Sequence, residues 1–136
     1  MEYIVHSIED THKIAYKVAE GLKGGEIILL NGDLGAGKTT FTKGIAKALG
    51  IDEVVTSPTF TFMKEYAGRI NLYHFDMYRV EEADELYELG LNEYLGDKTG
   101  VCVIEWNKFE NIQNPIIINI EVIDDTSRKI EIKWIF

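Results

Sequence analysis

The residues of this sequence with the clearest chemical meaning lie at positions 32–39, which read GDLGAGKT. This segment matches the pattern G-x-x-x-x-G-K-S/T at every defined position. Glycines allow successive backbone N–H groups to approach a phosphate closely, and a helix that begins at the end of the loop adds its positive dipole. The segment therefore predicts a site that holds the phosphates of a nucleoside triphosphate.

The side chains at the end of this motif predict contacts to the phosphates and to a metal ion. Lys38 is expected to reach the β- and γ-phosphates, and the hydroxyl of Thr39 is expected to ligate Mg²⁺. The alternative is a glycine turn beside an ordinary solvated lysine. The residues of this segment that are expected to bind the nucleotide are Asp33, Leu34, Gly35, Ala36, Gly37, Lys38, Thr39 and Thr40.

Two carboxylates are candidates for the reaction itself, because hydrolysis needs a second group that holds the metal's water shell or aims the attacking water. Glu105 follows the apolar run 101–104, and ligands of open α/β sheets gather at the carboxyl ends of strands. Asp76 ends another extended run. We predict Lys38, Glu105 and Asp76 as the catalytic groups, with Thr39 and Glu105 at the metal. The alternative for each carboxylate is a solvated strand end.

Three other side chains have a functional and a structural interpretation. Arg79 is a candidate for stabilising charge on the γ-phosphate, although an arginine three residues from Asp76 is as often part of a surface ion pair. Trp106 is a candidate to pack on the nucleotide, although aromatic residues beside strand ends usually complete a core. We interpret His74 as a hydrogen-bonded core residue, because it has no cysteine or second histidine near it in sequence.

The elements that must position these groups form a β-loop-α unit. Residues 26–31 are a short, β-branched apolar run, which predicts a buried strand immediately before the glycines. Residues 39–49 carry apolar side chains at helical spacing and are followed by a glycine, which predicts a helix immediately after them. An earlier helix is predicted over residues 11–22, with Thr11 or Asp10 as its N-cap.

The rest of the chain predicts more strands and one more helix. Alternating or apolar runs bounded by turn residues indicate the strands, and an acidic segment has a helical pattern. The ranges are strands at 59–62 and 70–75, a helix at 81–89, and strands at 101–105, 116–123 and 129–135. Together the elements predict an α/β fold of the P-loop NTPase type. Its sheet is expected to be central and mostly parallel, flanked by helices, with a β-hairpin in the middle of the chain and antiparallel C-terminal strands.

Size and charge limit the range of functions. A chain of 136 residues with 46% hydrophobic content predicts a single domain over residues 1–136. The chain has 23 acidic and 14 basic side chains, and its net charge of -9 disfavours tight direct binding to nucleic acid. We expect no membrane association and a cytoplasmic location, because no apolar run is long enough to span a bilayer and no signal-peptide pattern is present. The single cysteine, Cys102, lies in an apolar run and is predicted to be core.

A GTPase is the first alternative. Residues 107–110 read NKFE and resemble the guanine-reading pattern N-K-x-D, and residues 97–100 read DKTG and match D-x-x-G. The first segment carries Glu in place of Asp, and the second precedes a predicted strand where it should follow one. ATP is therefore the expected nucleotide.

A P-loop small-molecule kinase is the second alternative. Such enzymes usually carry an arginine-rich lid and an acceptor site. This chain has only Arg69, Arg79 and Arg128, which are widely spaced in the sequence. Hydrolysis is therefore favoured over phosphate transfer.

Four ordered motifs resemble those of the TsaE family, the bacterial ATPases required for making threonylcarbamoyladenosine in tRNA. The glycine motif and the two residues after it, 32–41, are similar to the family's P-loop. Residues 56–60, TSPTF, resemble its switch segment, residues 74–79, HFDMYR, resemble its H-x-D-x-Y-R block, and residues 104–106, IEW, resemble its I-E-W block. The likeness spans nearly the whole chain, since residues 128–132 also look like the family's closing strand.

This resemblance implies an ATPase that uses ATP and Mg²⁺, hydrolyses slowly alone and acts with TsaD-like and TsaB-like proteins, which carry the transfer step onto tRNA. The partners would contact tRNA, so this chain would reach it only indirectly. The resemblance also implies that Thr39 and Glu105 hold Mg²⁺, that Asp76 supports metal or water positioning, and that Thr59 belongs to a mobile switch at the nucleotide, ahead of the predicted hairpin. In one respect the chain differs: family members commonly carry an acidic residue shortly after I-E-W, where this chain has Asn107-Lys108.

Overall fold

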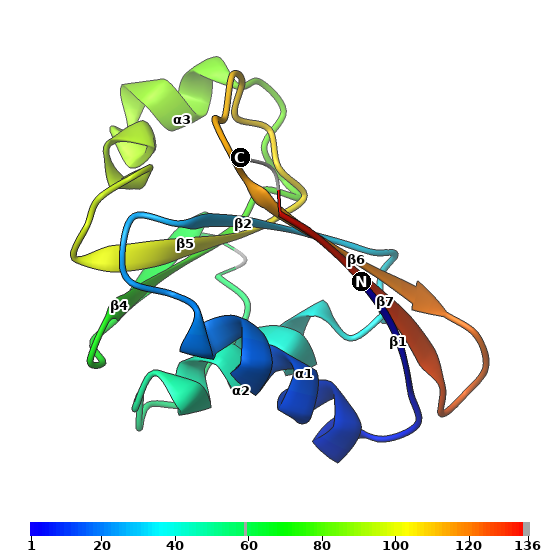
Figure 1. Cartoon of the computed structure of the whole chain (residues 1–136). Helices are drawn as coiled ribbons and strands as arrows, with labels where there is room; N and C mark the ends of the chain where they lie inside the picture. The colour runs from blue at the N-terminus through cyan, green and yellow to red at the C-terminus, as the bar shows by residue number, and fades with distance from the viewer. Residues whose placement is uncertain (59, 135–136) are drawn as a thin grey trace.

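The computed structural model describes residues 1–58 and 60–134 of the chain. In this part of the chain, one sheet of seven strands has the order β1-β7-β6-β2-β5-β4-β3 (Figure 1). In chain order the elements are β1 Glu2–Val5, α1 Ile8–Glu20, β2 Ile27–Asn31, α2 Lys38–Ala48, β3 Met63–Tyr66, β4 Asn71–Asp76, α3 Asp84–Glu88, the 3-10 helix η1 Leu91–Tyr94, β5 Gly100–Glu105, β6 Ile116–Val122 and β7 Arg128–Trp134.

The sheet is parallel in its centre and antiparallel at both sides. Strands β6, β2, β5 and β4 pair in parallel with one another. Antiparallel pairs add β7 and β1 on one side and β3 on the other. The predicted α/β class and the antiparallel C-terminal strands are confirmed, but the mostly parallel sheet is corrected to a mixed one. The hairpins β3–β4 and β6–β7 give two antiparallel pairs, because a short turn joins only antiparallel neighbours, and the pairing of β1 with β7 adds a third that was not predicted.

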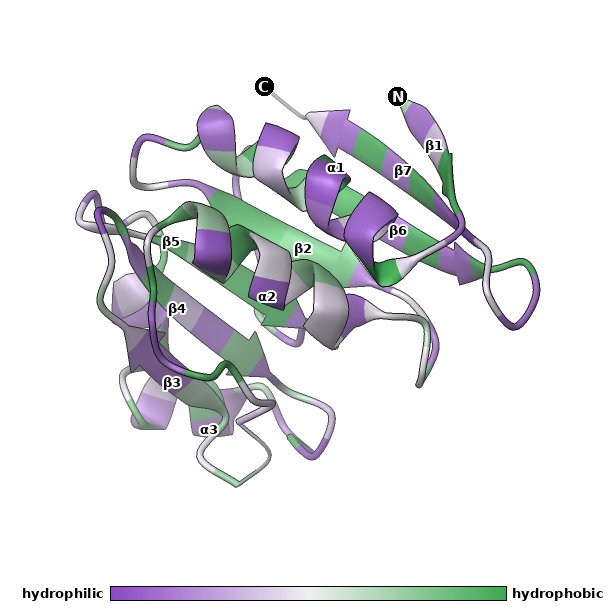
Figure 2. Cartoon of the chain, turned by 90° about the horizontal axis from the view of Figure 1, so that it is seen from below, coloured by the Kyte–Doolittle hydropathy of each residue, from purple (hydrophilic) through white to green (hydrophobic). Residues whose placement is uncertain are grey.

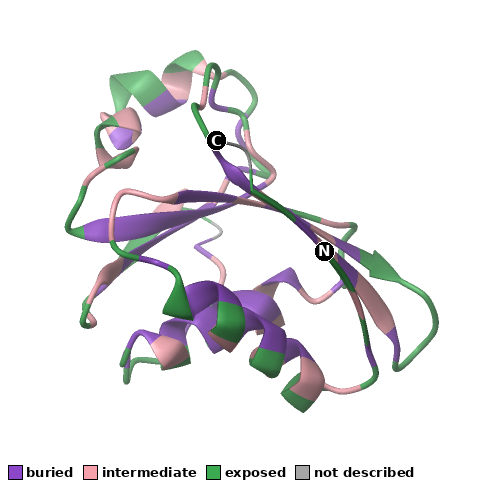
Figure 3. Ribbon diagram, in the orientation of Figure 1, coloured by how far each residue is buried: buried purple, intermediate pink, exposed green. Residues whose placement is uncertain are grey.

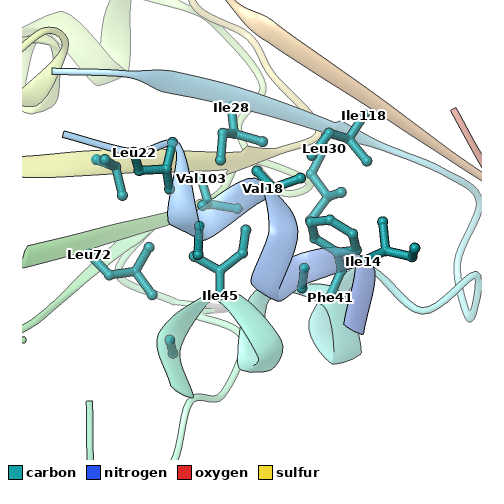
Figure 4. Packing of buried hydrophobic residues seen from close by; sticks show 14 of the residues in the cluster. Ile14, Val18, Leu22, Ile28, Leu30, Phe41, Ile45, Leu72, Val103 and Ile118 are labelled. Carbon is teal, nitrogen blue, oxygen red and sulfur yellow. The ribbon is translucent and has the colours of Figure 1, made fainter. Parts of the chain in front are cut away.

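Helices α1 and α2 pack side by side on one face of the sheet, and α3 lies on the other face (Figures 1 and 2). The helix surfaces that face the sheet are buried, and their outer surfaces are exposed (Figure 3). This arrangement follows from apolar side chains that recur at helical spacing along both helices. Figure 4 shows the resulting core, where the labelled residues are Ile14, Val18, Leu22, Ile28, Leu30, Phe41, Ile45, Leu72, Val103 and Ile118.

A second core lies between the opposite face of the sheet and the segment that contains α3 and η1. It includes Cys102, which is 1% exposed and donates a hydrogen bond from Sγ to the Tyr94 carbonyl at 3.3 Å. Burial, with a smaller contribution from the charge of Asp97, raises the pKa of this thiol to about 12. The prediction of Cys102 as a core residue is confirmed.

The N-terminal elements differ from those predicted. Helix α1 begins at Ile8, and the Ser7 hydroxyl caps it by accepting a hydrogen bond from the Asp10 N–H at 3.0 Å. The prediction of Thr11 or Asp10 as the N-cap is wrong, because Ile8 is exposed and its place in the first turn does not follow the buried apolar pattern. Strand β1 was not predicted, since its pairing partner, β7, is supplied by the far end of the sequence.

The central hairpin is shifted relative to the prediction. Its first strand is β3, whereas the alternating residues 59–62 predicted a strand. Thr59 lies outside the described residues, Phe60 and Thr61 form a turn, and Phe62 has a φ of 65°. The helix predicted over 81–89 is confirmed only at Asp84–Glu88. The last strand is described up to Trp134, so residue 135 of its predicted range lies outside the described residues.

None of the helices in residues 1–58 and 60–134 is long and apolar enough to cross a membrane.

Candidate functional site

The glycine loop, residues 32–37, connects the end of β2 to the start of α2. Gly35 and Gly37 have φ values of 79° and 107°, in the left-handed region that favours glycine. A Cβ built at either position would meet no heavy atom of the described residues within 4 Å. The loop therefore borders open space at both glycines, which is what a bound group would require.

The first turn of α2 borders the same open space as the two glycines. Gly37 is the N-cap of this helix, and no side chain among the described residues caps it. The first N–H groups of a helix have no partner within the helix, and they carry its positive dipole end. The loop and the helix start therefore form an arrangement that suits an anion.

Lys38 is the first residue of α2, and it is only 5% exposed. Its Nζ donates a hydrogen bond to the Gly32 carbonyl at 2.6 Å and lies 3.6 Å from the centre of the Trp106 ring. Burial lowers the pKa of this lysine from its usual 10.5, while the charges of Glu105, Asp76 and Asp33 act in the opposite direction. The predicted phosphate-binding lysine thus folds back onto the glycine loop itself.

The two predicted carboxylates lie side by side at the ends of neighbouring strands and line the same cavity as this lysine. Asp76 ends β4 and Glu105 ends β5, and the parallel register places the two residues directly opposite each other. Glu105 is 3% exposed, and its Oε2 lies 2.6 Å from His74 Nε2. Asp76 is half-buried, and its Oδ1 accepts a hydrogen bond from the Tyr78 N–H at 3.0 Å. The sequence prediction that ligand-facing groups gather at the carboxyl ends of the strands describes this arrangement.

These groups line one cavity of about 330 Å³, which we call the first cavity. Its lining is formed by Leu34, Gly35, Gly37, Lys38, Thr39, Thr40, Ser57, Asp76, Glu105 and Trp106. Most of the predicted site residues are thus brought together, although they come from three separate parts of the chain.

The oxygen atoms of the first cavity fit a hard cation such as Mg²⁺. Thr39 Oγ1 lies 3.2 Å from Ser57 Oγ, and Glu105 and Asp76 line the same cavity. The described residues contain no group of three or more His, Cys, Asp or Glu side chains that could hold a metal by themselves. A few protein oxygens completed by water and phosphate are the usual surroundings of Mg²⁺ at a nucleotide. Ser57 was not predicted, because its closeness to Thr39 exists only in the folded chain.

Trp106 follows Glu105 directly and has a φ of 55°, which is uncommon for a residue other than glycine. This conformation turns the chain at the end of β5 and brings the indole over Lys38. The ring also packs on Tyr78, with 5.0 Å between the ring centres. Trp106 is half-buried and lines the first cavity, so its packing on the nucleotide stays a prediction.

Three predicted site residues do not line the first cavity. Asp33 is exposed, and its carbonyl accepts a hydrogen bond from the Ala36 N–H at 3.0 Å. Arg79 is exposed, with its Cζ 5.2 Å from the centre of the Phe60 ring. Ala36 is buried and lines a neighbouring cavity. Thr59 lies outside the described residues.

This neighbouring cavity, the second cavity, has a volume of about 380 Å³ and shares Gly35, Gly37 and Thr40 with the first. The remaining lining is formed by His6, Ser7, Ile8, Thr11, Ala36, Ile120, Asp125, Thr126 and Arg128.

Arg128 fixes the wall of the second cavity to the glycine loop. Its Nε donates to the Ala36 carbonyl at 3.1 Å, and its Nη1 donates to the Asp124 and Ser127 carbonyls. Sequence reasoning missed this role because Arg128 and Ala36 are 92 positions apart in the sequence.

The fold and the site define an α/β protein with a glycine loop and a helix start that suit an anion, and with two carboxylates at the carboxyl ends of adjacent parallel strands. Comparison with known proteins gives the family. The family model described as "Threonylcarbamoyl adenosine biosynthesis protein TsaE" matches residues 5–131. The chain therefore belongs to the TsaE family of tRNA threonylcarbamoyladenosine biosynthesis proteins, and the predicted resemblance is confirmed.

Individual relatives agree with this assignment. A TsaE protein of Bacillus subtilis is 54% identical over 99 residues, which are 72% of this chain and 61% of that protein. The alignment thus spans less than two thirds of that relative. A TsaE protein of Treponema pallidum is 39% identical over 135 residues, covering 97% of this chain and 99% of that protein. The crystal structure of Bacillus subtilis YdiB matches with a TM-score of 0.84 and 38% identity, covering 100% of this chain and 86% of that one.

Proposed function

We propose that this chain is a P-loop ATPase that binds and hydrolyses ATP with Mg²⁺ as one component of tRNA threonylcarbamoyladenosine biosynthesis. The observation that carries the proposal is the first cavity, where the glycine loop, Lys38, Thr39, Asp76 and Glu105 converge. An anion-binding helix start, a buried cation and strand-end carboxylates are the parts that nucleotide hydrolysis requires. Membership in the TsaE family supports the pathway.

The two cavities suggest how the nucleotide lies. The phosphates would occupy the start of α2, with the γ-phosphate toward Lys38 and the strand-end carboxylates. The nucleoside would extend past Gly37 and Thr40 into the second cavity, because those residues line both cavities. Arg128 would support this placement by holding the β6–β7 loop against the glycine loop.

Each side chain of the first cavity has a role that its position permits. Lys38 would exchange its hydrogen bond to the Gly32 carbonyl for one to a phosphate oxygen. Thr39 and Glu105 would hold Mg²⁺, which neutralises phosphate charge, and Asp76 would orient water or the metal's water shell. Glu105 lies in a nearly dry position, where a fixed carboxylate acts strongly on its surroundings.

The GTPase alternative loses support from the places that its two fragments occupy. Asp97 accepts hydrogen bonds from Thr99 at the amino end of β5, whereas Glu105 ends that strand, which is about 20 Å long. The Asn107 side chain bonds to the backbone of Phe109, and Lys108 Nζ donates to the Val80 carbonyl. Both fragments serve the local structure, and ATP remains the proposed nucleotide.

The kinase alternative lacks a lid of arginines. Arg69 donates to the Ala19 carbonyl at 3.5 Å, Arg128 is tied to the glycine loop, and Arg79 lies over the Phe60 ring. The chain is also strongly acidic, so tRNA would be contacted through partners, which we propose to be TsaD-like and TsaB-like proteins. A role in tRNA modification fits the predicted cytoplasmic location.

Calorimetric titration with ATP and Mg²⁺ tests the binding step. Lys38→Ala should weaken binding by about 10- to 150-fold, since a hydrogen bond to a charged group contributes about 1.5–3 kcal/mol. Lys43→Ala is the matched control, because Lys43 lies on the same helix but is exposed to solvent. Equal effects of the two substitutions, or tighter binding of GTP than of ATP, would contradict the proposal.

Hydrolysis assays test the catalytic step and the partners together. The rate should be low for the chain alone and rise when TsaB-like and TsaD-like proteins are added. Phosphate transfer from ATP to a small acceptor would favour the kinase instead. Full tRNA modification by Glu105→Ala would show that hydrolysis is incidental.

A further inference from the structure

The buried pair of His74 and Glu105 lies on the face of the sheet that carries the first cavity. In the parallel register of β4 and β5, Asp76 lies opposite Glu105 and His74 lies opposite Val103. His74 is therefore a diagonal neighbour of Glu105 on that face, two positions before Asp76. The exposed fractions of His74 and Glu105 are 0% and 3%, and His74 Nε2 lies 2.6 Å from Glu105 Oε2.

The proposed role of Glu105 sets the expected direction of this hydrogen bond. A carboxylate that serves a cation or a reacting water is an acceptor only, so with the proposed function His74 Nε2 is the donor. The bond engages Oε2 of Glu105, which also lines the first cavity. It also prevents the carboxylate from rotating, because the imidazole is itself enclosed by the core.

A purely structural role does not explain a histidine at this position. Its Nδ1 is buried, and among the described residues it has no hydrogen-bond partner. Its neighbours on the same face, Leu72 and Val103, are aliphatic and belong to the main core. An aliphatic residue would avoid the free-energy cost of an unpaired buried nitrogen. Glu105 is the one polar partner that the described structure gives to the imidazole.

We propose that His74 is a positioning residue, which acts by fixing the carboxylate of Glu105 so that one chosen oxygen faces the metal and the reacting water. The proposal rests on the proposed function, because it assigns His74 a part in the same site. Hydrogen bonds behind metal-binding groups are known to orient them, and their loss typically lowers metal affinity or activity by about 10- to 100-fold.

Two substitutions distinguish the effect of losing the hydrogen bond from the effect of replacing the imidazole ring. The amide nitrogen of glutamine is the same number of bonds from Cα as His Nε2, so His74→Gln keeps a donor toward Glu105. The amide nitrogen of asparagine corresponds to Nδ1, so His74→Asn is equally polar but too short to reach the carboxylate. Melting curves and ATP binding without a divalent cation show whether each variant is folded.

The first readout is the binding of Mn²⁺ to the complex of the chain with a non-hydrolysable ATP analogue, followed by electron paramagnetic resonance. The second is partner-stimulated hydrolysis, resolved into kcat and KM. His74→Asn should lose about 10- to 100-fold in Mn²⁺ affinity or in kcat, with KM for ATP little changed. His74→Gln should recover most of that loss. Wild-type behaviour of both variants, or equal loss in both, overturns the proposal.

A measurement on the unaltered protein covers the case in which neither variant folds. Nitrogen-15 spectra of the histidine rings show which ring nitrogen carries hydrogen. Hydrogen on His74 Nε2 is expected, and a bare Nε2 overturns the proposal. This result is independent of hydrolysis. A wild-type chain without Mg²⁺-dependent hydrolysis would refute the proposed function, whereas a functional wild type with a bare Nε2 would refute only the role of His74.

Discussion

Gly44 tests the close contact between α1 and α2, because a methyl group added there has no room. A Cβ at this position would lie 2.7 Å from the Ala15 Cβ and 3.1 Å from His12 Cδ2. Two carbon atoms pack best at about 3.5–4.0 Å, so the helices would have to separate by roughly 1 Å. Overpacking of this kind costs about 1–3 kcal/mol of folding free energy.

Helix propensity acts in the opposite direction. Alanine is favoured over glycine inside a helix by about 1 kcal/mol, so propensity alone predicts that Gly44→Ala is stabilising. With the contact included, the variant should be destabilised by up to about 2 kcal/mol. Lys43 gives the control, because it is exposed on the same helix. The difference between Lys43→Ala and Lys43→Gly measures propensity without a change in packing.

Equilibrium unfolding in urea, followed by far-ultraviolet circular dichroism, measures these free energies. Ala15→Gly removes the methyl group that opposes the new one, so the double variant should be more stable than the sum of the single effects by about 1–3 kcal/mol. The reasoning is refuted if Gly44→Ala gains the full stabilisation measured at Lys43. Additivity of the two substitutions within about 0.5 kcal/mol would refute it as well.

Three other substitutions or treatments test separate parts of the structure. Because the pKa of Cys102 is raised to about 12 from 9.0, the folded protein should resist alkylation of this thiol at pH 8. Above pH 9 the thiol ionises in the unfolded chain before it does so in the folded one, so the free energy of unfolding should fall with rising pH. The fall should be smaller in Cys102→Ala. Ser7→Ala removes the N-cap of α1 and should lower the free energy of unfolding by about 1 kcal/mol in urea. Tryptophan emission should change when ATP and Mg²⁺ bind, because Lys38 must leave the Trp106 ring; the change should disappear in Trp106→Phe, with Trp134 as the remaining emitter.

Local patterns of apolar residues predicted the buried helices and the central strands. The apolar spacing of α1 and α2 and the uninterrupted apolar runs of β2 and β5 identified those elements, because each of them buries a whole face or both faces. The pattern failed at β1, where only one of four residues is buried and whose pairing depends on β7. It also failed at 59–62, where alternation alone imitates a strand although Phe60 and Thr61 form a turn.

In the candidate site, too, some residues could be predicted from the sequence and others could not. Lys38 and Thr39 follow from one continuous motif, and Glu105 follows from its place at the end of an apolar run. The contacts of Ser57 and Arg128 could not be predicted from a local pattern, because each joins the glycine loop or the start of α2 to a distant segment. A continuous motif predicts its own local backbone conformation. The side chains that surround it come from distant segments, and the packing of the whole sheet places them there.

The electrostatics of the first cavity give a physical reason for a divalent cation in the proposed reaction. Asp76 and Glu105 lie opposite each other at adjacent strand ends, and Lys38 is the cation nearest to them in the lining of the cavity. Bringing a triphosphate to the same cavity would add several negative charges to two carboxylates, one of which is buried. One lysine cannot balance that charge, and its own charge is already opposed by burial, which lowers its pKa. In the proposed reaction a divalent cation held by Glu105 and Thr39 would offset this repulsion, so we expect the site to bind the metal-bound nucleotide more tightly than the free nucleotide.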